Sequence, residues 1–254
     1  TITRSSMIGN SAVNGGGLLT ASADATAVIA HSSLISNSAT AYAAAVGGPY
    51  LSLLNSTILY NSGPSSIYKG NNASPITLAG TIVAHTLGGV NCVATSVFFP
   101  ITDGGYNVAD DASCGFTSPD SKNSGTITLS YSDTDILPAL DPGHPYTRRL
   151  YTPTAGSDPI GVIPVGTTVS VPGASWTCSN PSTATDQIGG ARPQPANTYC
   201  DLGAIESAAS RSQLTVTRTG TGTGTVTSSP AGISCGATCS GLFAGTVTLT
   251  AVPA

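Results

Sequence analysis

The residues of this chain best suited to chemistry are carboxylates, and they gather mainly in three groups. The groups are Asp103, Asp110 and Asp111; Asp133, Asp135 and Asp141; and Asp186, Asp201 and Glu206. Carboxylate oxygens bind calcium, yet neither of the first two groups follows a calcium-loop template, and loop aspartates also stabilise turns. The third group suits a metal or catalytic cluster, or else Asp186 and Asp201 cap turns while Arg192 pairs with a carboxylate. We favour the structural interpretation throughout and assign no catalytic, cofactor-binding or metal-binding residue, with calcium left open.

Cleavage of a polysaccharide would need paired carboxylates for acid–base work and a basic residue near an acidic sugar. Residues 1–90 contain a single carboxylate, Asp24, together with the basic residues Arg4 and Lys69. One carboxylate cannot form the required pair. This stretch therefore lacks the residues for cleavage, although sequence upstream of it could carry them.

The other reactive side chains do not combine into a known catalytic arrangement. His31, His85 and His144 have no acid and nucleophile partners in a triad pattern. The glycine-rich stretch 220–224 lacks the lysine and helix of a phosphate-binding loop.

Aromatic side chains offer a different possibility, because they stack on sugar rings. Tyr60 falls at the variable, outward-facing position of its repeat, which points weakly to a glycan-binding face. Single exposed aromatic residues are also ordinary on protein surfaces. The aromatic candidates are Tyr42, Tyr50, Tyr60, Tyr68, Phe98 and Phe99.

The composition excludes several classes of partner. Only 8% of the 254 residues are charged, and 8 basic against 12 acidic residues give a net charge of −4. Nucleic-acid binding and polybasic membrane contacts both need a basic footprint that is absent here. The sequence contains no apolar run long enough for a transmembrane helix. The apolar share of 40% is too high for a disordered chain.

Six cysteines fall into three local pairs, Cys92 with Cys114, Cys178 with Cys200 and Cys235 with Cys239. Zinc is the alternative, but no CxxC motif occurs and the histidines lie far from the pairs in sequence. The CxxxC of the last pair lacks a thioredoxin-like context, so a loop disulfide is preferred to a redox pair. The pairs therefore predict disulfides and an oxidising compartment.

Four stretches nearly repeat one another and predict a solenoid. They place Asn10, Asn37 and Asn61 at equivalent positions, with His85 in the fourth place as a stacked structural residue, at steps of 27, 24 and 24 residues. The stretches are SSMIGNS (5–11), SSLISNS (32–38), STILYNS (56–62) and GTIVAHT (80–86).

Each repeat holds two or three short apolar segments separated by turn residues, which predicts one coil of a parallel β-helix. Coils stack about 4.8 Å apart, so the asparagines should form a ladder of side-chain amides. A leucine-rich repeat is the rival, but its LxxLxLxxN pattern fails at Ser56. The predicted fold class is all-β.

The chain divides into four predicted parts. Residues 1–90 form the coils, and residues 91–206, rich in proline and carboxylates, form a disulfide-pinned cap over the last strand edges. Residues 207–213 are a linker. Residues 214–254 alternate apolar residues with threonine, which indicates a small β module whose sequence stops early. Because the chain starts and stops within motifs, we expect it to be a piece of a longer polypeptide.

Several runs carry a resemblance to known families. The coils and the run Asp186-Gln187, Arg192-Pro193-Gln194 and Cys200 to Glu206 resemble right-handed parallel β-helices of bacterial surface proteins, in particular the choice-of-anchor Q domain, over residues 1–206. The Gly-Gly-Pro-Thr stretch usual in that family appears here only as residues 141–147, DPGHPYT. Residues 214–254 are similar to a partial internalin-type B repeat. The resemblance implies export and display on a bacterial surface, and no established activity.

The sequence therefore predicts a non-enzymatic secreted or cell-surface protein whose β-helix serves as a stalk or adhesin-like module for carbohydrate or a partner surface. The alternative is the C-terminal part of a polysaccharide lyase or hydrolase with its catalytic coils upstream. Stacked Asp and Lys or Arg on consecutive coils would distinguish the alternative from the first hypothesis.

Overall fold

A computed structural model gives the fold of most of the chain. It describes residues 1–20, 27–70, 75–95, 101–132, 150–154, 157–179, 184–193, 198–207, 212–217, 219, 222–229, 231–235, 239–243 and 246–253. Within these ranges every regular element is a strand, which confirms the all-β prediction. The candidates Asp24, Phe98, Phe99, Asp133, Asp135, Asp141 and His144 lie outside the described residues, as do Gly220 and Thr221 of the glycine-rich stretch.

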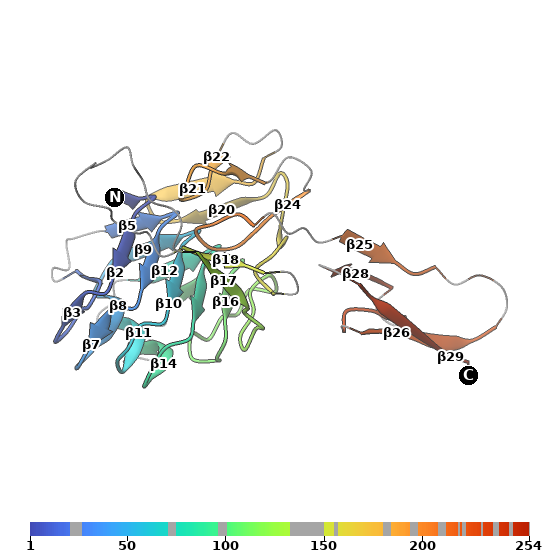
Figure 1. The fold of residues 1–254 in the computed structure, drawn as a ribbon, viewed down its shortest axis with the longest axis horizontal. Coiled ribbons are helices and arrows are strands. Elements are labelled where there is room, and N and C mark those ends of the chain that lie inside the picture. Colours follow the sequence, from blue (N-terminus) through green and yellow to red (C-terminus); the bar gives the residue numbers. More distant parts are fainter. Residues whose placement is uncertain are drawn as a thin grey trace.

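The chain winds through three parallel sheets in turn, about four times, and so forms the predicted parallel β-helix (Figure 1). The first sheet contains β1 (Ile2–Thr3), β5 (Ala27–Ala30), β9 (Leu51–Leu54), β12 (Ile76–Ala79) and β15 (Thr102–Asp103). The second contains β2 (Ser6–Ile8), β6 (Ser33–Ile35), β10 (Thr57–Leu59), β13 (Ile82–Ala84) and β16 (Val108–Ala109). The third contains β4 (Leu18–Leu19), β8 (Ala43–Gly47), β11 (Ser65–Lys69) and β14 (Val90–Ala94). Two short strands, β3 (Ser11–Ala12) and β7 (Ser38–Ala39), pair between the second and third sheets along the chain.

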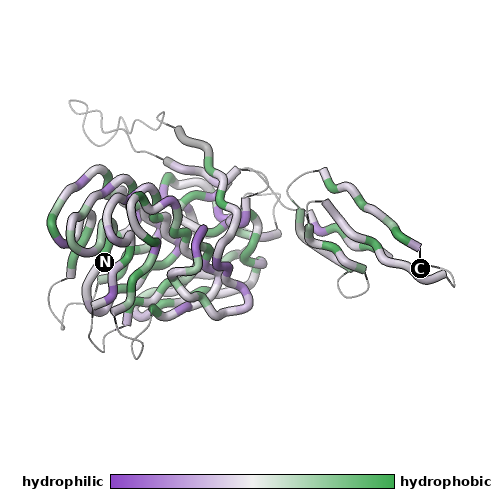
Figure 2. Tube along the Cα trace, turned by 90° about the horizontal axis from the view of Figure 1, so that it is seen from below, coloured by the Kyte–Doolittle hydropathy of each residue, from purple (hydrophilic) through white to green (hydrophobic). Residues whose placement is uncertain are grey.

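Apolar residues of successive coils stack in register to fill the interior. In the second sheet, for example, Leu34, Ile58 and Val83 are direct neighbours and all are fully buried. Each coil alone could not bury such residues, so the stack of coils creates the core. Figure 2 shows that most of the coil trace is pale or apolar, in line with the low charge content.

The asparagine ladder predicted from the repeats is present. The side-chain oxygen of Asn37 accepts bonds from the backbone N–H and the amide of Asn10, and that of Asn61 accepts the same two bonds from Asn37. The amide of Asn37 also donates to the Met7 carbonyl, and that of Asn61 to the Leu34 carbonyl. Asn37 and Asn61 are fully buried, so these bonds satisfy polar groups that would otherwise be costly.

The prediction that His85 takes the fourth ladder position is wrong by one residue. Leu59 pairs with Ala84, so His85 aligns with Tyr60, and Thr86 aligns with Asn61. The cause is Gly80, which adopts the left-handed conformation (φ 62°) that Asn55 has in the preceding coil (φ 44°). Glycine takes this conformation without steric cost. Gly80 therefore occupies the corner between the first and second sheets, where the preceding coil has Asn55, and not the position of Ser56 to which the repeats assign it.

Residues after the fourth coil close the end of the helix. β15 and β16 add to the first and second sheets, so parallel pairing continues beyond residue 90. Lys122 then bridges to Val108, and the Cys92–Cys114 disulfide ties β14 to residues 107–122, which we call the closing segment. This agrees with a disulfide-pinned cap.

A further segment covers the side of the solenoid. We call the described residues between 157 and 207 the lateral segment. Its hairpin of β20 (Thr168–Val171) and β21 (Ala174–Thr177) packs on β9 and β12 (Figure 1). The lateral segment therefore shields the first sheet as well as completing the cap. The remaining antiparallel pairs in and before it are β19 (Ile163–Pro164) with β24 (Tyr199–Cys200), β22 (Ala184–Thr185) with β23 (Ala191–Arg192), and β17 (Leu129–Ser132) with β18 (Leu150–Pro153).

The C-terminal part is a small antiparallel module, as predicted. β26 (Gly224–Ser229) pairs with β27 (Ser234–Cys235) and β29 (Thr248–Pro253), and β25 (Ser212–Thr215) pairs with β28 (Ser240–Phe243). Ile233, Cys235 and Phe243 form its small core. The three predicted disulfides, Cys92–Cys114, Cys178–Cys200 and Cys235–Cys239, are all formed.

Candidate functional site

The aspartates Asp186 and Asp201 accept hydrogen bonds from the backbone. Asp186 accepts N–H bonds from Ile188, Gly190 and Glu206 at 2.7–3.0 Å. Asp201 accepts N–H bonds from Gly161 at 2.6 Å and from Ser207 at 2.7 Å. Both aspartates are buried. Asp186 caps its own turn, as the structural interpretation expects, whereas Asp201 ties together backbone segments that are apart in sequence.

Arg192 holds these turns together from a fully buried position. Its Nε lies 3.2 Å from Oε2 of Glu206, and its two terminal nitrogens donate to the carbonyls of Gly203 and Asp201 at 2.7 and 2.5 Å. The guanidinium also lies 5.0 Å from the centre of the Trp176 ring, within cation–π range. Burial raises the pKa of Glu206 to about 8, against the opposing charge of Arg192. The cluster has no exposed side chain that could contact a substrate, so its geometry fits a structural role.

The same run attaches the lateral segment to the second sheet. Gln187 accepts a bond from the Ser33 hydroxyl and donates to the Ser5 carbonyl and the Ser6 hydroxyl. The backbone N–H of Ala204 donates to the Thr57 hydroxyl at 2.8 Å. This run is therefore an internal interface between the cap and the coils.

The described calcium candidates are occupied by hydrogen-bond donors of the protein. Asp103 accepts five bonds, from the backbone of residues 105, 117 and 118 and the side chains of residues 107 and 121. Burial alone would raise the pKa of Asp103, but these bonds outweigh it and lower the pKa. Asp111 accepts bonds from the Asn91 N–H and from Ser113. Within the described ranges, His, Cys, Asp and Glu nowhere gather in a group of three or more able to hold a metal ion.

His85 forms an ion pair and an aromatic stack. Its Nδ1 lies 3.1 Å from Oδ2 of Asp110, and its ring stacks on Tyr60 with the centroids 5.0 Å apart. The ring of Tyr151 also packs against that of Tyr60, with the centroids 5.1 Å apart. His85 therefore stacks on Tyr60 and not, as the repeats predicted, in the asparagine ladder. Tyr60 is half-buried in this stack and is not a free sugar-binding ring.

The third sheet presents the aromatic side chains that remain accessible. Its outward positions place Leu19, Gly47, Tyr68 and Val93 in register, and the ring of Tyr42 packs against that of Tyr68 at 4.7 Å. We call the surface formed by Leu19, Tyr42, Tyr68 and Val93 the open face. Among the described residues of the first 95, the exposed large apolar side chains all belong to this sheet or to segments next to it: Val13, Leu19, Tyr42, Tyr50, Leu87 and Val90.

The open face carries no exposed charge on its strands. The only charged residue in the third sheet is Lys69, which is fully buried at the end of β11. The other basic residue of the coils, Arg4, lies at the corner after β1. The described coils through residue 95 contain no carboxylate, so the pair needed for glycoside cleavage is missing there.

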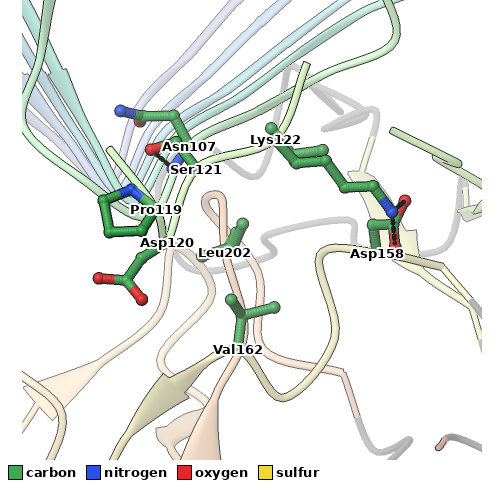
Figure 3. A pocket seen from close by; sticks show the side chains of 9 residues that line it. Asn107, Pro119, Asp120, Ser121, Lys122, Asp158, Val162 and Leu202 are labelled. Carbon is green, nitrogen blue, oxygen red and sulfur yellow. Dashed lines mark hydrogen bonds and ion pairs between the residues drawn. The ribbon is translucent and has the colours of Figure 1, made fainter. Parts of the chain in front are cut away.

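A pocket of about 390 Å³ lies between the closing segment and the lateral segment (Figure 3). Its wall includes an ion pair in which Lys122 Nζ lies 2.9 Å from each oxygen of Asp158. Sequence reasoning did not single out these residues or Asp120, because they come together from segments distant in sequence and match no motif. The lining residues are Asn107, Val108, Pro119, Asp120, Ser121, Lys122, Asp158, Val162 and Leu202.

Comparison with family models, with curated proteins and with solved structures finds no match to this chain. The three disulfides indicate an oxidising environment such as the extracellular space. In the part of the chain that the structure describes, no helix has the length and apolar character to cross a bilayer.

Proposed function

We propose that this chain is part of a non-enzymatic secreted or cell-surface protein, in which the β-helix is a rigid support and the open face binds carbohydrate or a partner surface. The observation that carries the proposal is the asymmetry of the solenoid. The lateral segment covers the first and second sheets, whereas the third sheet presents the half-buried Tyr68, beside the exposed Tyr42 that precedes β8, and no exposed charge on its strands. An uncharged surface with aromatic side chains, such as the open face, is suited to stacking on the apolar faces of sugar rings.

The resemblance to choice-of-anchor Q proteins and internalin-type B repeats supports the same proposal, because such proteins are displayed on bacterial surfaces. The disulfides are compatible with export. The alternative, the C-terminal part of a polysaccharide lyase or hydrolase, would place its catalytic carboxylates on coils upstream, because the described coils through residue 95 contain none.

Glycan-array binding of the whole chain tests the proposal. We expect retention of neutral glycans without cleavage, and we expect the double variant Tyr42→Ala/Tyr68→Ala to lose at least about fivefold in affinity, since aromatic contacts contribute about 1 kcal/mol or more. Val165→Ala, which truncates an exposed apolar residue of the lateral segment, is the matched control and should bind as the parent does. Absence of glycan binding would contradict the carbohydrate-binding part of the proposal, and release of new reducing ends would favour the enzyme.

A further inference from the structure

The pocket beside the closing segment is held in shape by both of its walls. The backbone N–H of Lys122 donates to the Asn107 carbonyl at 2.7 Å, which fixes the first wall. In the second wall, the N–H of Val162 donates to the Cys200 carbonyl and that of Leu202 to the Pro159 carbonyl. The Cys178–Cys200 disulfide anchors this wall further. A pocket built on such bonds exists before a ligand arrives, which lowers the entropic cost of binding.

The lining combines an aliphatic floor with polar groups at two ends. Leu202 and Val162 lie between the Lys122–Asp158 pair on one side and Asp120 on the other (Figure 3). The volume of about 390 Å³ falls in the range of small-molecule sites. A pyranose ring has the matching distribution, with C–H groups on one face and hydroxyls around its edge.

The charges of the pocket restrict the ligand further. Lys122 is already neutralised by Asp158, whose two oxygens it contacts. Asp120 is exposed at the rim of the pocket, beside Tyr106 and with its carboxylate turned outward from Val162 and Leu202 (Figure 3), and it adds a net negative charge there. This arrangement repels uronates, sialates and phosphates, whereas hydroxyl and amino groups can donate hydrogen bonds to the carboxylates.

We propose that this pocket binds a single sugar residue that carries no negative charge, either neutral or amino-substituted, with its ring on Val162 and Leu202 and its polar edge toward Asp120 and Lys122. This site shares no residue with the open face, so the inference does not depend on the proposed function.

Saturation-transfer NMR with the whole chain tests this inference. The probes are glucosamine, N-acetylglucosamine, galactose and mannose, with glucuronic acid and inorganic phosphate as anionic comparisons. We expect at least one of the first four to bind with a Kd of roughly millimolar strength, as suits a single small ring. Asp120→Ala should weaken that binding at least about fivefold by removing an acceptor, and Val162→Phe should abolish it by filling the pocket.

Two controls separate this site from other sources of signal. Thr117→Ala alters an exposed residue outside the lining and should bind as the parent does. The open-face variant Tyr42→Ala/Tyr68→Ala should also bind normally, so loss there would assign the signal to the other surface. The inference is overturned if no uncharged or amino sugar binds, if glucuronic acid binds equally well, or if Asp120→Ala leaves the affinity unchanged.

Discussion

At the scale of single residues, the two described histidines lie in opposite environments. His31 is largely buried, and burial together with the charges of Arg192 and Arg4 lowers its pKa to about 3. The hydrogen bond of His85 to Asp110 raises the pKa of this histidine against the opposing effect of burial. Burial alone would raise the pKa of Asp110, but hydrogen bonds from His85 and Asn91 outweigh it and lower the pKa to about 2. The chain therefore keeps one histidine neutral and favours charge on the other.

We predict that His85 titrates above the ordinary histidine value of 6.5 and that His31 stays neutral throughout the range between about pH 4 and pH 9. Because the folded pKa of His85 is raised, its stabilising contribution is complete below the unfolded value and disappears as the pH rises through the folded value. NMR titration of the imidazole signals measures both pKa values. Asp110→Asn should lower the pKa of His85 and leave His31 unchanged. A His85 pKa at or below 6.5 in the parent would contradict the prediction.

At the scale of elements, the attachment of the lateral segment to the second sheet depends on a close approach at Gly203. This residue has a φ of 82°, and a Cβ added there would lie 2.6 Å from Ile82 Cδ1 and from Thr57 Oγ1. Its N–H also donates to the Gly80 carbonyl at 2.7 Å. A larger residue must push the lateral segment away from the sheet.

We therefore predict that Gly203→Ala destabilises the protein by more than about 2 kcal/mol, through left-handed backbone strain and overpacking together. Gly189→Ala is the matched control, because Gly189 has a similar φ of 92° and no atom within 4 Å of the added Cβ. It should cost only about 1 kcal/mol, from backbone strain alone. Urea unfolding with the disulfides intact measures both. Equal effects of the two substitutions would show that the contact with Thr57 and Ile82 is not tight.

Some of these elements were predictable from sequence and others were not. The repeats revealed the coils and the asparagine ladder, since Asn37 and Asn61 recur with their apolar neighbours at a constant spacing. Aligning the repeats by residue type placed His85 one position away from where it lies. The reason is that Gly80 replaces Asn55 by sharing its left-handed backbone conformation and not its side-chain chemistry. The packing of the lateral segment on the coils could not be predicted from the sequence. Nothing in the sequence distinguishes Thr57, which accepts a bond from Ala204, from a coil threonine that faces solvent. The pocket was missed for the same reason, since Lys122 and Asp158 are brought together only by tertiary structure.

At the scale of the whole molecule, the stability of a solenoid is approximately the sum of contacts between neighbouring coils. The strands of the second sheet show this directly. β6 and β10 each pair with a strand on both sides, whereas β2 is paired on one side only. The residues of β2 are half-exposed, while those of β6 and β10 are all buried. In a polypeptide of residues 1–254 alone, coil stability should therefore rise from the first coil toward the third.

Hydrogen exchange of the whole chain measures this gradient, because amides exchange through local opening whose free energy reflects the contacts broken. We predict that amides of β2 exchange at least about tenfold faster than those of β10, equivalent to a difference of about 1.4 kcal/mol in opening free energy. β10 and β2 occupy the same place in the coil, so their backbone geometry is matched; β10 differs in having a neighbouring coil on both sides and in the bond of Thr57 to the lateral segment. Equal protection would mean that another surface covers the half-exposed Met7 and its neighbours in solution, and dilution of the sample would then distinguish a second copy of the chain from an intramolecular contact.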